Sequence, residues 1–128
     1  MKDSLNKVKE FHQTFGLEYH ESPTINVSDR IIELRHRLMQ EENDEYLEAA
    51  KAKDLELVAD ALGDKLYILC GTIISHGLQH KIMEVFEEIH RSNMSKLDEN
   101  GKPIYREDGK IMKSTQYFLP DIKAVLEK

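Results

Sequence analysis

Proline is scarce in this chain, and its placement decides what the chain can fold into. The sequence has three prolines: Pro23, Pro103 and Pro120. Proline ends or kinks a helix because it lacks a backbone N–H and clashes with the preceding turn. The proline-free stretch 24–102 therefore permits helices of many turns, and no internal repeat divides it.

Apolar residues recur at helical spacing in four segments, which predicts four amphipathic helices. They run from about Ser4 to Gly16, from the N-cap Ser28 to about Ala50, from the N-cap Asp54 to near Gly77, and from about Ile82 to Ser95. After them, the stretch 104–112 around Asp108-Gly109 predicts a short hairpin or an ordered loop, and Pro120-Asp121 starts a last short helix. We expect an all-α, four-helix-bundle-like fold with a hairpin tail and a C-terminal helix.

Length and composition narrow the class of protein. The chain has 128 residues, so we expect a single domain over residues 1–128. No apolar run approaches the roughly 20 residues of a membrane span, and the start lacks a secretory signal, so we expect a cytoplasmic protein with no membrane partner. The only cysteine, Cys70, excludes an internal disulfide and a cysteine-based zinc site, and we expect it in the core.

The charge is unevenly placed along the chain. The net charge of −6 argues against a nucleic-acid partner. Residues 1–90 carry 10 Lys and Arg against 18 Asp and Glu, whereas residues 91–128 carry 8 against 6. An acidic body is thus followed by a mildly basic tail, which reflects either ordinary solvation or a functional site.

The acidic residues of the second predicted helix continue its apolar stripe. At about 100° per residue, the stripe that includes Leu34 and Leu38 arrives at Glu42 and Glu45. The face that packs against the core at one end therefore presents carboxylates at the other. Taken alone, this pattern more often belongs to a helix whose end is exposed to solvent.

The third predicted helix favours a different interpretation. Asp60 and Asp64 stand four residues apart on one face, where like charges repel and Asp is a poor helix former. Two antiparallel helices with a short link would bring Glu41, Glu42 and Glu45 opposite them. An all-oxygen ligand set selects a hard cation, which predicts Mg²⁺ or Mn²⁺. The alternative is a pair of exposed acidic faces without a metal.

Polar residues also replace apolar ones near the end of the fourth predicted helix. Asn93 and Lys96 continue its apolar stripe. Next to a metal–carboxylate cluster, an amide and an ammonium are suitable donors to phosphate oxygens. Each residue taken singly is more often a solvated surface residue. The loop that follows adds four cations: Lys102, Arg106, Lys110 and Lys113.

Two Glu-x-x-His pairs offer a competing metal site. Glu33 with His36 and Glu87 with His90 match the pattern that di-iron carboxylate proteins use in four-helix bundles. Both pairs fall off the apolar stripes of their helices, so the imidazoles would not point inward. We therefore expect these histidines on the surface. No glycine-rich loop of the Rossmann or P-loop kind is present.

Three motifs together resemble a known superfamily. Residues 41–45 (EENDE) and 59–64 (ADALGD) resemble the EExxE and ExxD motifs of the all-α nucleoside triphosphate pyrophosphohydrolases. This superfamily includes MazG-like enzymes, dimeric dUTPases and phosphoribosyl-ATP pyrophosphohydrolases. Residues 89–96 (IHRSNMSK) resemble a bacterial and phage subgroup of the MazG-like proteins.

The resemblance implies a hydrolase that cleaves a (deoxy)nucleoside triphosphate between the α and β phosphates, giving a monophosphate and pyrophosphate. It implies Mg²⁺ as the cofactor, with Mn²⁺ able to substitute, and a homodimer or dimer of dimers. It implies Glu41 as the general base, in a role that could be exchanged with Glu42. The implied metal ligands are Glu42, Glu45, Asp60 and Asp64, and the implied substrate-binding residues are Asn93, Lys96, Lys110 and Lys113.

One departure from the family pattern leaves a second function open. The second motif of the family has Glu three residues before Asp, whereas Leu57 and Ala61 stand three residues before Asp60 and Asp64. The spacing of four keeps both carboxylates on one helical face, but the shorter Asp side chain changes the metal geometry. The alternative function is a non-catalytic helical module that binds a nucleotide or regulates without turnover.

Overall fold

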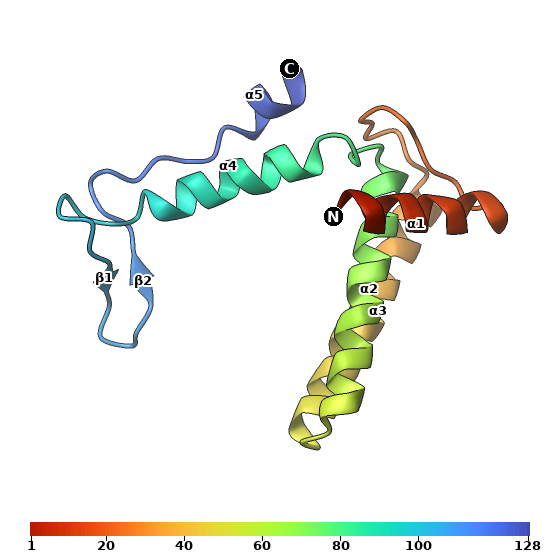
Figure 1. Cartoon of the computed structure of the whole chain (residues 1–128), viewed down its shortest axis with the longest axis horizontal. Helices are drawn as coiled ribbons and strands as arrows, with labels where there is room; N and C mark the ends of the chain where they lie inside the picture. Colours follow the sequence, from red (N-terminus) through yellow and green to blue (C-terminus); the bar gives the residue numbers. More distant parts are fainter. The chain divides into compact units, whose positions relative to one another are not determined.

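The computed structural model describes all 128 residues, and helices account for most of its regular structure (Figure 1). Five α-helices and one two-stranded sheet follow one another along the chain, which confirms the predicted all-α class. The chain divides into two compact units, Met1–His80 and Lys81–Lys128. The single domain therefore stays a prediction. None of the helices combines the length and apolar character needed to cross a membrane.

The first unit consists of α1 (Lys2–Thr14), α2 (Asp29–Lys51) and α3 (Leu55–Ser75). The long helices α2 and α3 lie side by side and antiparallel, because only residues 52–54 connect them (Figure 1). Helix α1 packs on α3. The facing sides of α2 and α3 therefore form the longest contact in the unit, and the predicted acidic residues lie on these two helices.

The ends of α2 and α3 are set by the residues that the sequence indicates. The hydroxyl of Ser28 accepts the backbone N–H of Ile31 at 3.3 Å, and the carboxylate of Asp54 accepts that of Leu57 at 3.1 Å. Each bond satisfies one of the free N–H groups of a first helical turn. Helix α3 stops before Gly77, whose φ of 67° is accessible to glycine at little cost. Both predicted N-caps are confirmed.

The core of the first unit lies where α1 and α2 meet α3. Its buried apolar residues are Leu5 and Val8 of α1, Val27 before α2, Ala49 of α2, and Ala61, Cys70, Ile73 and Ile74 of α3. Burial of one Leu, Ile or Val side chain stabilises a fold by about 1.5–3 kcal/mol. Cys70 is 1% exposed, so its predicted place in the core is confirmed.

A buried arginine ties α2 to α3 within this core. Arg35 donates from Nε to the hydroxyl of Thr72 at 3.1 Å and from Nη2 to the carbonyl of Ile68 at 2.8 Å. Its guanidinium lies over Gly71, where an added Cβ would collide with it. His12 of α1 is buried beside the same glycine, and burial lowers its pKa. The two helices are therefore held in register by polar contacts as well as by apolar packing.

The second unit begins with α4 (Ile82–Met94) and ends with α5 (Ile122–Glu127), which packs on α4. Between them, β1 (Ile104–Tyr105) and β2 (Ile111–Met112) pair antiparallel across a turn that contains Gly109 at φ 86°. The predicted hairpin is confirmed. Asp121 caps α5 by accepting the N–H of Ala124 at 3.1 Å, so the predicted C-terminal helix is confirmed as well.

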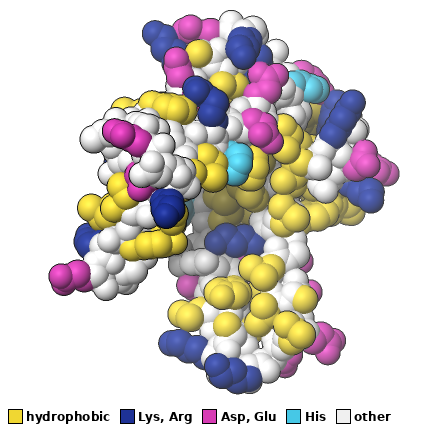
Figure 2. All heavy atoms as spheres, turned by 60° about the vertical axis from the view of Figure 1, so that its left-hand side comes forward, with side chains coloured by type: hydrophobic (Ala, Val, Ile, Leu, Met, Phe, Trp, Pro, Cys, Tyr) yellow, Lys and Arg dark blue, Asp and Glu magenta, His cyan; other side chains and the backbone are white.

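Hydrophobic side chains remain on the surface among the charged ones (Figure 2). On α3, Leu62, Leu66 and Leu69 are 49%, 45% and 41% exposed, and on α4 Phe86 is 61% exposed. Helix α3 is therefore apolar around more of its circumference than α1 and α2 cover. A helix that is apolar on most sides is typical of a buried position.

Candidate functional site

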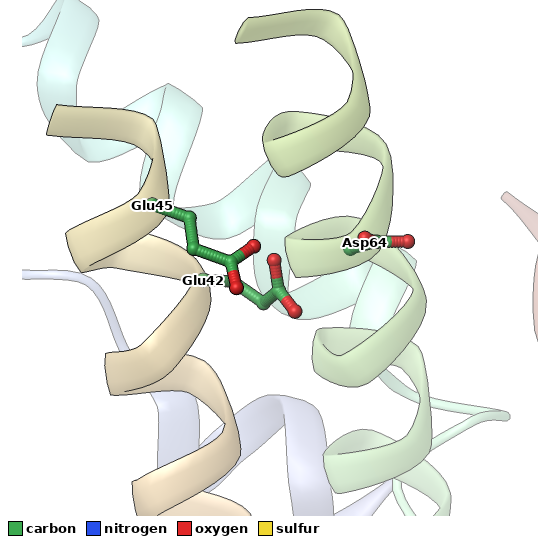
Figure 3. A group of neighbouring side chains, drawn as sticks. All are labelled: Glu42, Glu45 and Asp64. Carbon is green, nitrogen blue, oxygen red and sulfur yellow. The ribbon is translucent and has the colours of Figure 1, made fainter. Parts of the chain in front are cut away.

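Three carboxylates from two helices converge in the first unit (Figure 3). Glu42 and Glu45 extend from α2 and Asp64 belongs to α3, and one carboxylate oxygen of each lies within 4.8 Å of the others. No other group of three or more His, Cys, Asp or Glu side chains in the chain brings its donor atoms this close. The structure thus brings together three of the four predicted metal ligands, called the carboxylate trio below.

Helical geometry explains why the trio forms. Glu42 and Glu45 stand one turn apart on the side of α2 that also carries the buried Ala49. On α3, the buried Ala61 lies one turn before Asp64. The distance between two packed helices depends on the side chains at their contact, so small alanines let α2 and α3 approach closely here. The charged side chains therefore lie at a contact between two rigid elements.

Glu42 is the most perturbed acid of the trio. Its Oε2 atom is buried and has no hydrogen-bond partner. Burial, the neighbouring Glu45 carboxylate and the charges of Asp64 and Asp60 raise the pKa of Glu42 to about 7. A proton or a bound cation relieves repulsion of this kind. The orphaned oxygen and the all-carboxylate donor set therefore fit a hard divalent cation such as Mg²⁺ or Mn²⁺.

Asp60, the fourth predicted ligand, borders the trio. It lies one turn before Asp64 on α3, is exposed, and contributes to the raised pKa of Glu42. Asp60 and Glu45 also line a pocket of about 280 Å³ between α2 and α3. Asp60 is therefore placed at the approach to the trio, where a ligand of the cation could contact it.

The two positions that depart from the family pattern have different surroundings. Leu57 is 52% exposed and lines the same pocket as Asp60. Ala61 is 2% exposed at the contact between the helices, where a longer acidic side chain would bury an additional charge. The place with room for a further carboxylate is therefore that of Leu57, and an apolar side chain occupies it.

Glu41 lies outside the trio. Its side chain is exposed on α2, and it is not among the charges that raise the pKa of Glu42. Its role as general base stays a prediction. The four residues of the competing Glu-x-x-His pairs are all exposed, which confirms the surface position expected for their histidines: Glu33, His36, Glu87 and His90.

The predicted substrate-binding residues all lie in the second unit. Asn93 is exposed in the last turn of α4, and Lys96 follows that helix by two residues. Lys110 lies in the turn of the hairpin, next to β2. Lys113 directly follows β2, and its ammonium lies 4.8 Å from the centre of the Tyr117 ring. The structure therefore places Asn93 and Lys96 at the end of α4, and Lys110 and Lys113 at the hairpin.

A segment without helix or strand, residues 114–121, is fastened to α4 by side chains for which the sequence predicts no role. We call this segment the strap. Ser92, which is 2% exposed, donates to the carbonyl of Phe118 at 2.8 Å, and the hydroxyl of Ser95 accepts the N–H of Phe118 at 3.1 Å. Ser114 donates to the carbonyl of Ser95 at 3.1 Å. Serine side chains thus replace the backbone partners that an extended segment would find in a sheet.

The far end of the strap is held by a carboxylate. Glu88 accepts the N–H of Asp121 at 2.7 Å and forms an ion pair with Arg91 at 2.8 Å. The hydrogen bonds from Arg91 and from the Asp121 backbone keep the pKa of Glu88 below its usual value. The guanidinium of Arg91 also lies 4.3 Å from the centre of the Phe118 ring. The signal in the sequence was the spacing of Glu88, Ser92 and Ser95, which places three polar side chains on one face of α4.

A family model and several solved structures match this chain. The family model for phosphoribosyl-ATP pyrophosphohydrolase matches residues 8–93, which include the carboxylate trio, Asp60 and Asn93. A crystal structure of a candidate NTP pyrophosphohydrolase from Exiguobacterium sp. 255-15 is 30% identical, covering 97% of this chain and 91% of that chain, with a TM-score of 0.48. No curated protein matches the chain.

Proposed function

Since the chain belongs to the phosphoribosyl-ATP pyrophosphohydrolase family and is a nucleotide pyrophosphohydrolase, we propose that its substrate is a (deoxy)nucleoside triphosphate. Cleavage between the α and β phosphates would give a nucleoside monophosphate and pyrophosphate. The observation that carries the proposal is the carboxylate trio with its orphaned Glu42 oxygen. Membership of a hydrolase family favours turnover over the alternative of a non-catalytic module.

The proposed cofactor is Mg²⁺, which Mn²⁺ could replace. Glu42, Glu45 and Asp64 would hold it, and Asp60 would add a ligand from the approach to the trio. When bound, such a cation supplies Lewis-acid polarisation of phosphoryl oxygens. The two helices contribute rigidity, because their ligands project from packed backbone rather than from loops.

We propose Glu41 as the general base. Its exposed carboxylate adjoins Glu42 in sequence but stays outside the trio, so it is free to take a proton. Water would attack the α-phosphorus, its proton would pass to Glu41, and the bond to the bridging oxygen would break with the electron pair leaving on pyrophosphate. Glu41→Gln and Glu42→Gln distinguish Glu41 from Glu42 as the general base. Glu41→Gln would lower kcat at unchanged Mg²⁺ affinity, whereas Glu42→Gln would weaken Mg²⁺ binding.

Asn93, Lys96, Lys110 and Lys113 are the proposed substrate-binding residues. Their amide and ammonium groups are donors to phosphate oxygens, and ammonium groups offset the charge that develops on departing pyrophosphate. The mild basic excess after residue 90 supports this assignment, because the acidic majority of the chain would otherwise repel a polyanion.

We also propose a homodimer or dimer of dimers in the cytoplasm. The exposed leucines along α3, at steps of four and three residues, support an oligomer, since soluble monomers rarely leave large apolar side chains in contiguous exposed groups. The single thiol, Cys70, supports a reducing compartment. Sedimentation of the purified protein tests the first statement, and a monomer at micromolar concentration would contradict it.

The reaction itself is tested with a substrate panel. The protein is incubated with Mg²⁺ and each standard dNTP, NTP or phosphoribosyl-ATP in ¹⁸O-labelled water. We expect pyrophosphate as the product and the label in the monophosphate. Orthophosphate release would contradict the proposal, and turnover of phosphoribosyl-ATP alone would correct its substrate. Glu45→Gln should abolish turnover, whereas Glu33→Gln, an exposed change on the same helix, should not.

A further inference from the structure

Helix α4 has a polar face that the proposed mechanism does not use. Asn93 and Lys96, which the mechanism uses, lie on one side of the helix end. Glu88, Ser92 and Ser95 recur at steps of four and three residues, so they form a separate stripe. All three bond to the strap. Helix α4 therefore presents one row of side chains to the proposed substrate and another row to the strap.

The contacts between the stripe and the strap are specific. Both backbone groups of Phe118 are satisfied by serine hydroxyls, the carbonyl by Ser92 and the N–H by Ser95. The Ser95 hydroxyl in turn donates to the carbonyl of Ser92 at 2.5 Å. Backbone groups shielded from water need such partners, and here both come from the last turn of α4 and its C-cap residue. The register of the strap along the helix is therefore fixed at Phe118.

This register also places two lysines. Ser114 donates to the carbonyl of Ser95 at 3.1 Å, and the neighbours of these two residues in sequence are Lys113 and Lys96. Lys113 is held further by its contact with the ring of Tyr117, which belongs to the strap. The two backbone segments that carry these ammonium groups are thus joined by a hydrogen bond. An anion with several oxygens can accept hydrogen bonds from more than one ammonium group, so the arrangement favours such an anion as their shared ligand.

We propose that Ser92 and Ser95 are positioning residues, which fasten the strap so that Lys96 and Lys113 act on the same polyphosphate group. The serines do not touch the substrate. They fix where the backbone presents the two ammonium groups. The identity of the ligand rests on the proposed function, whereas the role of the serines depends only on binding of a polyphosphate.

The test uses the full chain with Ser92→Ala, Ser95→Ala and the conservative Ser95→Thr. Ser75→Ala is the matched control, because Ser75 is a buried serine of the first unit whose hydroxyl donates to the carbonyl of Gly71 at 2.9 Å. The measurements are kcat and KM at several salt concentrations, and calorimetric binding of Mg²⁺-tripolyphosphate.

We expect each alanine variant of the stripe to raise KM and the tripolyphosphate Kd by about tenfold, the size of one lost hydrogen bond with a buried partner. The value of kcat should change little. The salt dependence of KM should flatten, because fewer ammonium groups then contact the phosphates. In Ser95→Thr, KM and the tripolyphosphate Kd should stay close to the wild-type values, because threonine keeps the hydroxyl. Ser75→Ala should leave both unchanged. Wild-type KM and salt dependence in Ser95→Ala would overturn the proposal.

A double-mutant cycle with Ser92→Ala covers the case in which Ser95→Ala folds poorly. Lys113→Gln changes an exposed side chain and should weaken tripolyphosphate binding in the wild-type background but hardly at all in Ser92→Ala, where the lysine is already misplaced. Additive effects would overturn the proposal. If the wild type turns over no nucleotide, the proposed function fails, and the tripolyphosphate measurements still decide the role of the serines. Absence of tripolyphosphate binding in the wild type would overturn it.

Discussion

The two units of the molecule hold their charged residues in different ways. In the first unit, Glu42, Glu45 and Asp64 project from two long helices whose backbones are packed against each other. In the second unit, Lys110 lies in the turn of a two-stranded hairpin and Lys113 directly follows its second strand. The strap, which comes next in the sequence, is held by individual hydrogen bonds. The acidic residues are thus positioned by secondary structure and the basic ones by side-chain contacts. Changes in the first unit should therefore act on metal binding and stability, and changes in the second on substrate affinity.

The largest effect is expected from Glu42→Gln. Activity should fall about a hundredfold to a thousandfold, because a catalytic cation contributes several kcal/mol and each ~1.4 kcal/mol is tenfold. The metal-free variant should nevertheless be at least as stable as the wild type, since the amide removes a buried charge and can donate to Glu45. Steady-state kinetics and thermal unfolding check the two parts. Loss of stability in parallel with activity would show that Glu42 is mainly structural.

Gly71→Ala should have the next largest effect. The added Cβ would collide with the Arg35 guanidinium, and overpacking of this kind costs about 1–3 kcal/mol of unfolding free energy. Gly63→Ala on the same helix is the control, because a Cβ there meets nothing within 4 Å, so helix propensity should raise stability by up to about 1 kcal/mol. Urea unfolding measures both. Equal effects at the two glycines would contradict the register assigned to α2 and α3.

The pH dependence of Mg²⁺ binding should be a smaller effect than that of Gly71→Ala, and it should depend on the first unit alone. The pKa of Glu42 is raised from 4.5 to about 7, so the folded metal-free protein keeps a proton that the unfolded chain loses. The stability due to this proton is complete below pH 4.5 and lost as pH rises through 7. A cation must displace the proton, so Mg²⁺ affinity should rise with pH, by at most about tenfold per unit, and level off above 7.

Calorimetric titration with Mg²⁺ across the range from about pH 5 to 8 measures this dependence. Glu42→Gln provides the control, since it has no such proton to release. An affinity that is independent of pH in the wild type would show that Glu42 is not at the cation.

Glu88→Gln should have the smallest effect and act on the second unit alone. The ion pair with Arg91 and the N–H of Asp121 lower the pKa of Glu88, so its contribution to stability is present at neutral pH and lost as pH falls through the folded-state value. The variant should speed amide exchange at Asp121 and leave Mg²⁺ affinity unchanged. Glu84→Gln, also on α4, is the matched control. A change in Mg²⁺ affinity would contradict the separate roles of the two units.

Much of the first unit could be predicted from the sequence because its determinants are local. The N-caps Ser28 and Asp54, and the side of α2 that carries Glu42 and Glu45, follow from the 3.6-residue period of a helix. A short link then makes α2 and α3 antiparallel, which is enough to bring Asp64 opposite. The proposed role of Glu41 depends on a bound substrate and stays a prediction.

Other features could not be predicted because they depend on contacts between distant residues. Arg35 continues the apolar stripe of α2, yet only the structure shows that its guanidinium bonds to Ile68 and Thr72. The bonds of Ser92 and Ser95 to Phe118 join residues 26 and 23 positions apart through a loop and a hairpin. The periodicity of apolar residues in the sequence does not predict such contacts. Contacts between side chains and distant segments therefore cannot be read from the sequence, whether they join paired helices or hold an irregular segment.

The crossing of Arg35 over Gly71 also constrains how this sequence can diverge. While an arginine occupies position 35, any side chain at position 71 meets its guanidinium. A smaller residue at position 35 would free that space and at the same time remove the bonds to α3 that the arginine supplies. The two positions should therefore covary among homologues, with larger residues at 71 only where 35 has lost its arginine. Such linked substitutions would report the register of α2 and α3 in relatives of unknown structure.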